Sequence, residues 1–235
     1  VLLVVLLLML VYFDRPENIL RRTRFDGQQV SGAGQILNAD FDRRLILLAA
    51  DVPDRMTADE ELTLDLYWRA PQTADQEYST SVVAVDRQGI VAGQSDKQHP
   101  GVIPTTRWAT DEYARDQHTL QLLPGTPPGD YDIRVRVYRY GRPEERLNVL
   151  DENGAPAGQE LTIASVTVER PEVAAEMEQI TAAERVEWPA GDGLVLAAYT
   201  LAEGPVAAGQ PLFLEVIWQA AAATTVDRPS KAGLS

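Results

Sequence analysis

Few residues in this chain could do acid–base or metal chemistry. It has two histidines, His99 and His118, and no cysteine. We identify no further ligands that would complete a metal site around either histidine, and we interpret both as loop residues. Asp111 and Glu112 could form a carboxylate pair, but neighbours on an extended strand point to opposite faces. A hydrolase is therefore the weakest of three interpretations.

Two short motifs could bind a cation or a phosphate. Residues 151–154 begin like a calcium loop, but the bidentate glutamate that should follow is missing, and Asn153-Gly154 is a common turn signal. Gly32 and Gly34 lack the third glycine and the helix of a phosphate-binding loop. The sequence thus predicts no catalytic residue, no metal ligand and no cofactor.

Aromatic side chains offer the remaining chemistry, because their faces stack on the apolar side of sugar rings while polar groups at the rim supply hydrogen bonds. The candidates for glycan contact are Trp108, Tyr113, Tyr138 and Tyr140. A structural role competes for Trp108, which could fill the space under a long loop. Trp68 and Trp218 lie on alternating faces of apolar strands, and we interpret them as core anchors.

The elements that would position these residues are strands. After a Pro-Pro-Gly turn, Tyr131, Ile133, Val135 and Val137 alternate with polar residues, which is the period of a half-buried strand. Similar segments occur along the chain, and a hairpin is expected where residues 78–86 and 90–94 flank the Gly89 turn. The expected strands are residues 45–52, 62–68, 78–86, 90–94, 119–123, 131–139, 147–150 and 160–169, with a bulge between Ile163 and Val166. About eight short strands predict an all-β fold, a two-sheet antiparallel sandwich of immunoglobulin-like or jelly-roll-like type.

Residues 1–13 form an unbroken apolar run that ends in Tyr12 and Phe13. The run is shorter than the ~20 residues that cross a bilayer, and the terminal aromatics suit a headgroup interface. We interpret it as the end of a transmembrane helix, with a signal-peptide core or a buried strand as alternatives. The arginines at 15, 21, 22 and 24 would favour the cytoplasmic side for the residues that follow.

The chain also contains an internal repeat. Residues 195–198 match residues 47–50, and residues 212–220 match residues 62–70. We therefore expect the end of a membrane helix (1–13), a connector (14–40), a β-sandwich (41–170), an acidic linker (171–191) and a truncated second β-sandwich repeat (192–235). The linker could instead form a short amphipathic helix. Residues 194–218 are expected to form two paired strands that do not close a sandwich by themselves.

Several motifs together resemble one known family. They are Leu62–Ala70, Asp86–Gly89, Gln94–Asp96, Pro104–Trp108, Pro127–Tyr131 with the strand end at Tyr138, and Arg146–Leu147. This set resembles the extracytoplasmic C-terminal β-sandwich repeats of bacterial polytopic membrane glycosyltransferases, of the protein mannosyltransferase and lipid-linked-sugar class. The resemblance covers about residues 40–170. This chain departs from the family at 79–82, where Ser and Thr replace the usual aromatics.

The resemblance implies a non-catalytic, membrane-tethered module on the extracytoplasmic side of the cell membrane, accessory to a glycosyltransferase whose catalytic part lies outside this sequence. Its expected partners are the membrane, through residues 1–13, and a glycan or lipid-linked sugar. The family's catalytic residues lie in regions absent here, so none is carried over. A free-standing surface-anchored carbohydrate-binding or adhesion module is the alternative. The net charge of -14 argues against a nucleic-acid partner.

Overall fold

The computed structural model describes residues 23–25, 27, 30, 33–173, 175–181, 184–191, 193–201, 212 and 214–220. The chain divides into two compact units, Val1–Ala175 and Glu176–Ser235, and each is described by itself. Within the described ranges, no helix has the length and apolarity needed to span a bilayer. The expected membrane segment, residues 1–13, lies outside the described residues.

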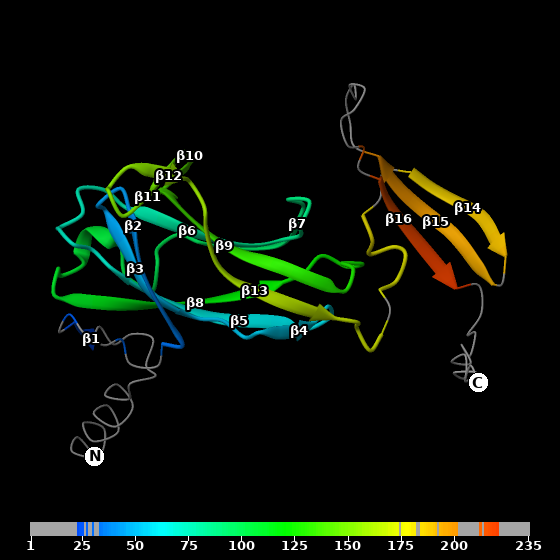
Figure 1. The fold of residues 1–235 in the computed structure, drawn as a ribbon, viewed down its shortest axis with the longest axis horizontal. Coiled ribbons are helices and arrows are strands. Elements are labelled where there is room, and N and C mark those ends of the chain that lie inside the picture. Colours follow the sequence, from blue (N-terminus) through cyan, green and yellow to red (C-terminus); the bar gives the residue numbers. More distant parts are fainter. Residues whose placement is uncertain are drawn as a thin grey trace, which may run out of the picture. The chain divides into compact units, whose positions relative to one another are not determined.

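Unit 1 is a β-sandwich of two sheets (Figure 1). The first sheet has seven strands in the order β1 (Thr23–Arg24), β8 (Glu112–Gln121), β5 (Glu61–Arg69), β3 (Leu45–Asp51), β2 (Gln35–Phe41), β11 (Val149–Leu150) and β12 (Pro156–Gly158). The second has the order β4 (Arg55–Thr57), β13 (Leu161–Glu169), β9 (Gly129–Arg139), β6 (Tyr78–Val85) and β7 (Val91–Lys97), with β10 (Arg142–Arg146) paired to β9. All pairs are antiparallel except β4 with β13. A 3-10 turn, η1 (Thr105–Arg107), lies between β7 and β8.

The core lies between the two sheets. The inward face of β9 presents Ile133 and Val135, and that of β5 presents Leu64 and Trp68; all four are at most 1% exposed. The alternation predicted for residues 131–137 is confirmed, because β9 buries every second residue there. Strand β6 differs, since all of its residues are buried. The expected hairpin is also present, since β6 pairs with β7 across the Gly89 turn. The bulge in β13 falls between Thr162 and Ala164.

Sequence patterns missed strand β2, at the end of the expected connector, and the first part of strand β8. Residues 35–40 belong to β2, although they were assigned to the connector. A bulge between Ile36 and Ala39 breaks the period of two, and Asn38 has a positive φ of 52°, a conformation that Asn tolerates better than most residues. Strand β8 begins at Glu112 rather than Thr119, so Tyr113 and His118 both belong to it.

A smaller apolar cluster covers the outer face of the first sheet. Tyr67 and Tyr113 meet edge to face with ring centroids 6.1 Å apart, and Phe25 packs on Tyr113 at 6.4 Å. Val30, Leu48 and Ala49 complete this buried cluster. Beside it, Arg115 makes two hydrogen bonds to the Asp65 carboxylate, at 2.8 and 2.6 Å. Phe25 and Val30, which precede β2, therefore cover this part of the sheet.

Unit 2 contains one three-stranded sheet, β14 (Glu184–Gly191), β15 (Leu194–Leu201) and β16 (Leu214–Ala220), within the described residues. Residues 184–191 are a strand and not part of the acidic linker that the composition predicts. As in β2, a bulge between Arg185 and Trp188 hides the period of two. Residues 175–181 contain a turn and no helix.

The repeat is also present in the pairing register. In unit 1, Leu47 pairs with Trp68, a bulge follows, and Ala50 pairs with Leu66. In unit 2, Leu196 pairs with Trp218, a bulge follows, and Tyr199 pairs with Val216. The neighbouring pairs agree as well: Gln35 with Ala50 and Ala39 with Leu47 correspond to Glu184 with Tyr199 and Trp188 with Leu196. The second copy therefore includes β14, and Leu196, rather than Val195, occupies the place of Leu47.

Candidate functional site

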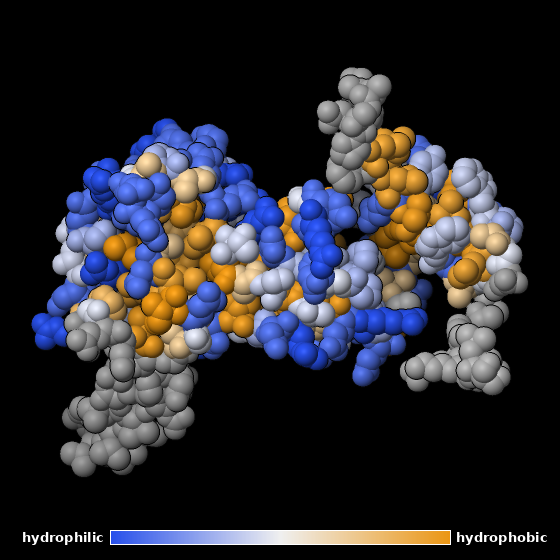
Figure 2. Space-filling view, in the orientation of Figure 1, coloured by the Kyte–Doolittle hydropathy of each residue, from blue (hydrophilic) through white to orange (hydrophobic). Residues whose placement is uncertain are grey.

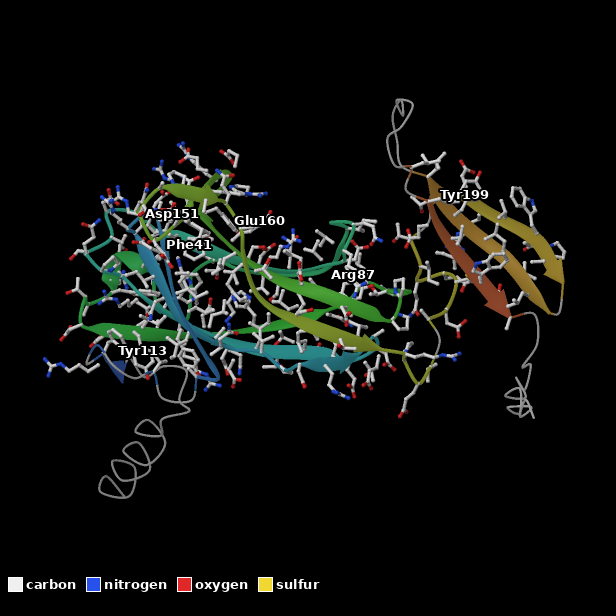
Figure 3. All side chains as sticks on the ribbon, in the orientation of Figure 1. Phe41, Arg87, Tyr113, Asp151, Glu160 and Tyr199 are labelled. Carbon is white, nitrogen blue, oxygen red and sulfur yellow. The ribbon has the colours of Figure 1, made fainter. Side chains whose placement is uncertain are left out.

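The structure separates the four aromatic residues proposed for glycan contact. Trp108 is buried, and its indole N–H donates to the Ile103 carbonyl at 2.9 Å, which is the loop-filling role. Tyr113 is buried where β1 meets β8, within the outer cluster of the first sheet (Figure 3). Neither ring offers a face to a ligand in this arrangement.

Tyr138 and Tyr140 lie at one end of the second sheet. Tyr138 is on the outer face of β9, opposite Ser79 of β6. Tyr140 follows β9, its N–H donates to the Glu77 carbonyl at 2.9 Å, and its side chain is exposed. The ring of His99, from the segment after β7, lies 5.7 Å from the Tyr140 ring. We call Tyr138, Tyr140, His99 and Ser79 the Tyr140 surface.

Polar groups continue from the Tyr140 surface along the outer face of the sheet. Ser79 donates its hydroxyl to the Gln98 carbonyl at 2.9 Å. In the next row, Ser81 of β6 lies between Arg136 of β9 and Asp96 of β7. Among the described residues, no hydrogen-bond partner is found for Ser81 Oγ or for Arg136 Nε. Both atoms are buried, so they are unpaired polar groups beneath the surface and are not presented to a ligand on this face.

Charge on this face is balanced locally. Glu160 accepts ion pairs from three arginines, with Arg136 at 2.7 Å, Arg146 at 3.4 Å and Arg134 at 3.7 Å. Figure 3 labels Glu160 on the side of unit 1 away from Tyr113. Burial, followed by the charge of Asp96, raises the pKa of the Tyr138 phenol. Tyr138 therefore presents a neutral hydroxyl at physiological pH, the form that can both donate and accept.

A second polar cluster lies inside the sandwich, where β7 of one sheet approaches β8 of the other. The buried carboxylate of Asp116 accepts from Thr80 Oγ1 at 3.1 Å and from His118 Nε2 at 3.0 Å. Lys97 Nζ lies 3.2 Å from the other carboxylate oxygen as an ion pair. On its far side, His118 Nδ1 lies 3.2 Å from Ser95 Oγ.

Burial alone would raise the pKa of the Asp116 carboxyl, but the hydrogen bond and charge of His118, the Gly101 N–H and the charge of Lys97 hold it below its ordinary value. Asp116 is therefore ionised, and its carboxylate lies within hydrogen-bond distance of His118 Nε2, while the other ring nitrogen of His118 lies within hydrogen-bond distance of the Ser95 hydroxyl. Ser, His and Asp also form nucleophilic relays in hydrolases. Here, Asp116 and His118 are completely buried and Lys97 neutralises the carboxylate, so the cluster is a buried ionic network that joins the sheets.

The other candidate groups do not come together. Asp111 is paired with Arg24 at the surface, at 3.3 Å, and Asp151 caps its own turn by accepting from the N–H groups of Asn153 and Ala155. Across the residues that the structure describes, no cluster of three or more His, Asp or Glu could hold a metal ion. The sequence analysis assigned both histidines to loops; His99 is in one, but His118 is a buried strand residue.

Comparisons with known proteins add little. No family model matches the chain. No curated protein matches it. Among solved structures, part of the chain is similar to a β-glucuronidase from glycoside hydrolase family 2, with 12% identity and a TM-score of 0.31. That match covers 43% of this chain and 11% of the other, so the chain spans only a small part of that enzyme.

Proposed function

We propose that unit 1 is a non-catalytic glycan-contact module, tethered to the extracytoplasmic side of a membrane and accessory to a glycosyltransferase whose catalytic part lies outside this sequence. Two kinds of observation support the proposal. The motifs of residues 62–70, 104–108 and 127–131 resemble those of such accessory repeats, and residues 1–13 have the composition of a membrane segment. The all-β sandwich is the expected scaffold.

The observation that carries the glycan-contact part is the Tyr140 surface. An exposed phenol ring beside an imidazole ring offers apolar faces for a sugar ring. The neutral hydroxyl of Tyr138, on the outer face of β9, offers hydrogen bonds to sugar hydroxyls beside these rings. Flat sheet surfaces with one or two aromatic rings and a polar row suit the mixed apolar and polar surface of a carbohydrate.

A free-standing carbohydrate-binding or adhesion module is the second candidate. The same Tyr140 surface supports it, because the surface needs no enzyme nearby. Further hydrophobic spans encoded upstream of Val1 would favour the accessory role, and a start codon immediately before it would favour the free-standing role.

The experiment is a glycan array with the full chain, followed by calorimetric titration of any sugar that binds. We expect weak binding with Kd near ~1 mM, the affinity that a small number of ring stacks and hydrogen bonds supplies. The Tyr140→Ala variant should weaken it by about 2- to 12-fold, because one aromatic contact contributes about 0.5 to 1.5 kcal/mol.

The matched control is Ile90→Ala, an exposed apolar residue at the other end of β6 and β7. This variant should bind like the original chain. Equal losses in both variants, or no response to any sugar, would reduce unit 1 to a spacer.

A further inference from the structure

The apolar face of the β14–β15–β16 sheet is the feature that the proposed function does not use. Directly paired residues share a face of a sheet, so the register places one set of large apolar residues together. The members of this set, which we call the Trp218 face, are Trp188, Leu194, Leu196, Tyr199, Leu201, Leu214, Val216 and Trp218. Figure 2 shows hydrophobic residues over β15 and β16 in this unit.

The Trp218 face corresponds to a core face in unit 1. Trp218 occupies the place of Trp68 and Val216 that of Leu66, by the register of the repeat. Trp68 and Leu66 have no exposed surface, whereas Trp218 is 51% and Val216 is 42% exposed. In unit 1, an antiparallel sheet with aliphatic residues at every second position covers this face. By analogy with unit 1, the partner expected to cover the Trp218 face is therefore a β-sheet with one apolar face.

We propose that the Trp218 face is an interface between two copies of this chain, in which two β14–β15–β16 sheets pack face to face as a sandwich. The Trp218 face is itself a sheet with one apolar side, so a second copy meets the requirement set by unit 1. Two sheets stacked about 10 Å apart around a two-fold axis give the same layering as one sandwich.

The size of the face suits a stable dimer. Six of its members are 42% to 59% exposed: Trp188, Leu194, Leu201, Leu214, Val216 and Trp218. Since a fully exposed aromatic side chain offers about 150 to 250 Å² and a leucine somewhat less, the face presents roughly 600 Å². Two such faces bury roughly 1,200 Å², the lower end of specific interfaces. The rings of Trp188 and Tyr199 are stacked with centroids 6.3 Å apart on this face.

Electrostatics favour a second copy of the chain as the partner and determine how the dissociation constant of the dimer depends on salt. Glu184, which begins the edge strand β14 and pairs with Tyr199, lies at the margin of this face, and the other paired positions on it carry no acidic or basic side chain. Facing copies therefore bring no like charges together at the centre of the face. The two chains nevertheless repel each other, because each has a net charge of -14. Dimerisation by an apolar face against this repulsion should strengthen as salt rises, since screening weakens repulsion and leaves apolar burial intact. An interface built on ion pairs would show the opposite trend.

The test is sedimentation equilibrium of the full chain over a range of concentrations at low and high salt. We expect a monomer–dimer equilibrium, and we expect the dissociation constant to fall by at least about threefold as salt is raised. The Val216→Lys variant should raise the dissociation constant by about 100-fold or more, because a charge would be buried without a partner. Its matched control is Glu215→Lys, which puts lysine at the adjacent position on the opposite face and should leave the dissociation constant within about threefold.

Tryptophan fluorescence of the original chain provides a second test, which does not depend on whether Val216→Lys folds. Dilution through the dissociation constant should shift the emission to the red as Trp188 and Trp218 become exposed. A chain that stays monomeric at all concentrations would overturn the proposal, whether the two tryptophans are exposed or covered by another part of the same chain. A dimer that persists in Val216→Lys with unchanged affinity would overturn it as well.

Discussion

Strands β2–β3–β5 and β14–β15–β16 have the same pairing register and very different surroundings. In the first set, Trp68 packs edge to face on Phe41 with ring centroids 5.4 Å apart, and no part of its surface is exposed. In the second set, Trp218 at the same register position is half exposed. The register of a three-stranded sheet therefore follows from the local sequence, including its bulges. Burial depends on a covering sheet, which the described part of unit 2 does not contain.

The largest expected difference between the two sets of strands is the effect on stability of removing Trp68 or Trp218, which occupy equivalent register positions. Trp68→Ala should lower the free energy of unfolding of unit 1 by about 3 to 5 kcal/mol, because it removes a fully buried indole and leaves a cavity. Trp218→Ala should change that of unit 1 by less than about 0.5 kcal/mol. Urea unfolding followed by circular dichroism measures both. Equal losses in the two variants would mean that the register equivalence does not define separate cores.

The second contrast concerns the ionic network, which has no counterpart among the described residues of unit 2. Asp116→Asn should cost about 3 kcal/mol in unit 1, since it leaves the buried ends of Lys97 and His118 without their carboxylate. The Glu145→Gln variant is the control, because Glu145 also pairs with arginines but at the surface. Urea titration of the two variants measures the difference.

The same network gives unit 1 a pH dependence with a defined sign. The pKa of Asp116 is lowered in the folded state, so the carboxylate binds protons more readily when the chain is unfolded. Its contribution to stability is complete above the pKa of the unfolded aspartate, about 3.9, and is lost as the pH falls through the lower folded-state value. Acid titration of Asp116→Asn should therefore be flatter in this range than that of the original chain.

Sequence reasoning identified the strands whose residues alternate and missed those that a bulge interrupts. The alternation of Ile133 and Val135 predicted β9 because the side chains keep a period of two. Both β2 and β14 were assigned to connecting segments, since their bulges, at equivalent positions, shift the apolar residues to the other face.

The candidate site was harder to predict than the fold. Trp108 and Tyr138 are both aromatic, and only the tertiary structure decides that one fills a loop and the other faces outward. The network around Asp116 was missed because its members come from β6, β7 and β8. The one local signal was Asp116 and His118 two residues apart, a spacing that places both side chains on the same face of a strand.

The smallest effect of a substitution on stability is expected at the bridge that connects the two sheets of unit 1. Gly93 of β7 forms an isolated bridge with Leu122, and a Cβ at Gly93 would lie 2.6 Å from the Gln121 carbonyl oxygen. Gly93→Ala should therefore lower the free energy of unfolding of unit 1 by about 1 to 2 kcal/mol, because the backbone must move apart to admit one methyl group.

Gly89→Ala is not a suitable control, since Gly89 has a φ of 88° and strain alone would destabilise the variant. Ser95→Ala on the same strand is better, because it adds no atom. Hydrogen exchange at Leu122 and its neighbours, measured for both variants, should show loss of protection in Gly93→Ala alone. Loss of protection in both would locate the effect in the polar network, and loss in neither would mean that the bridge contributes nothing to closing the sandwich.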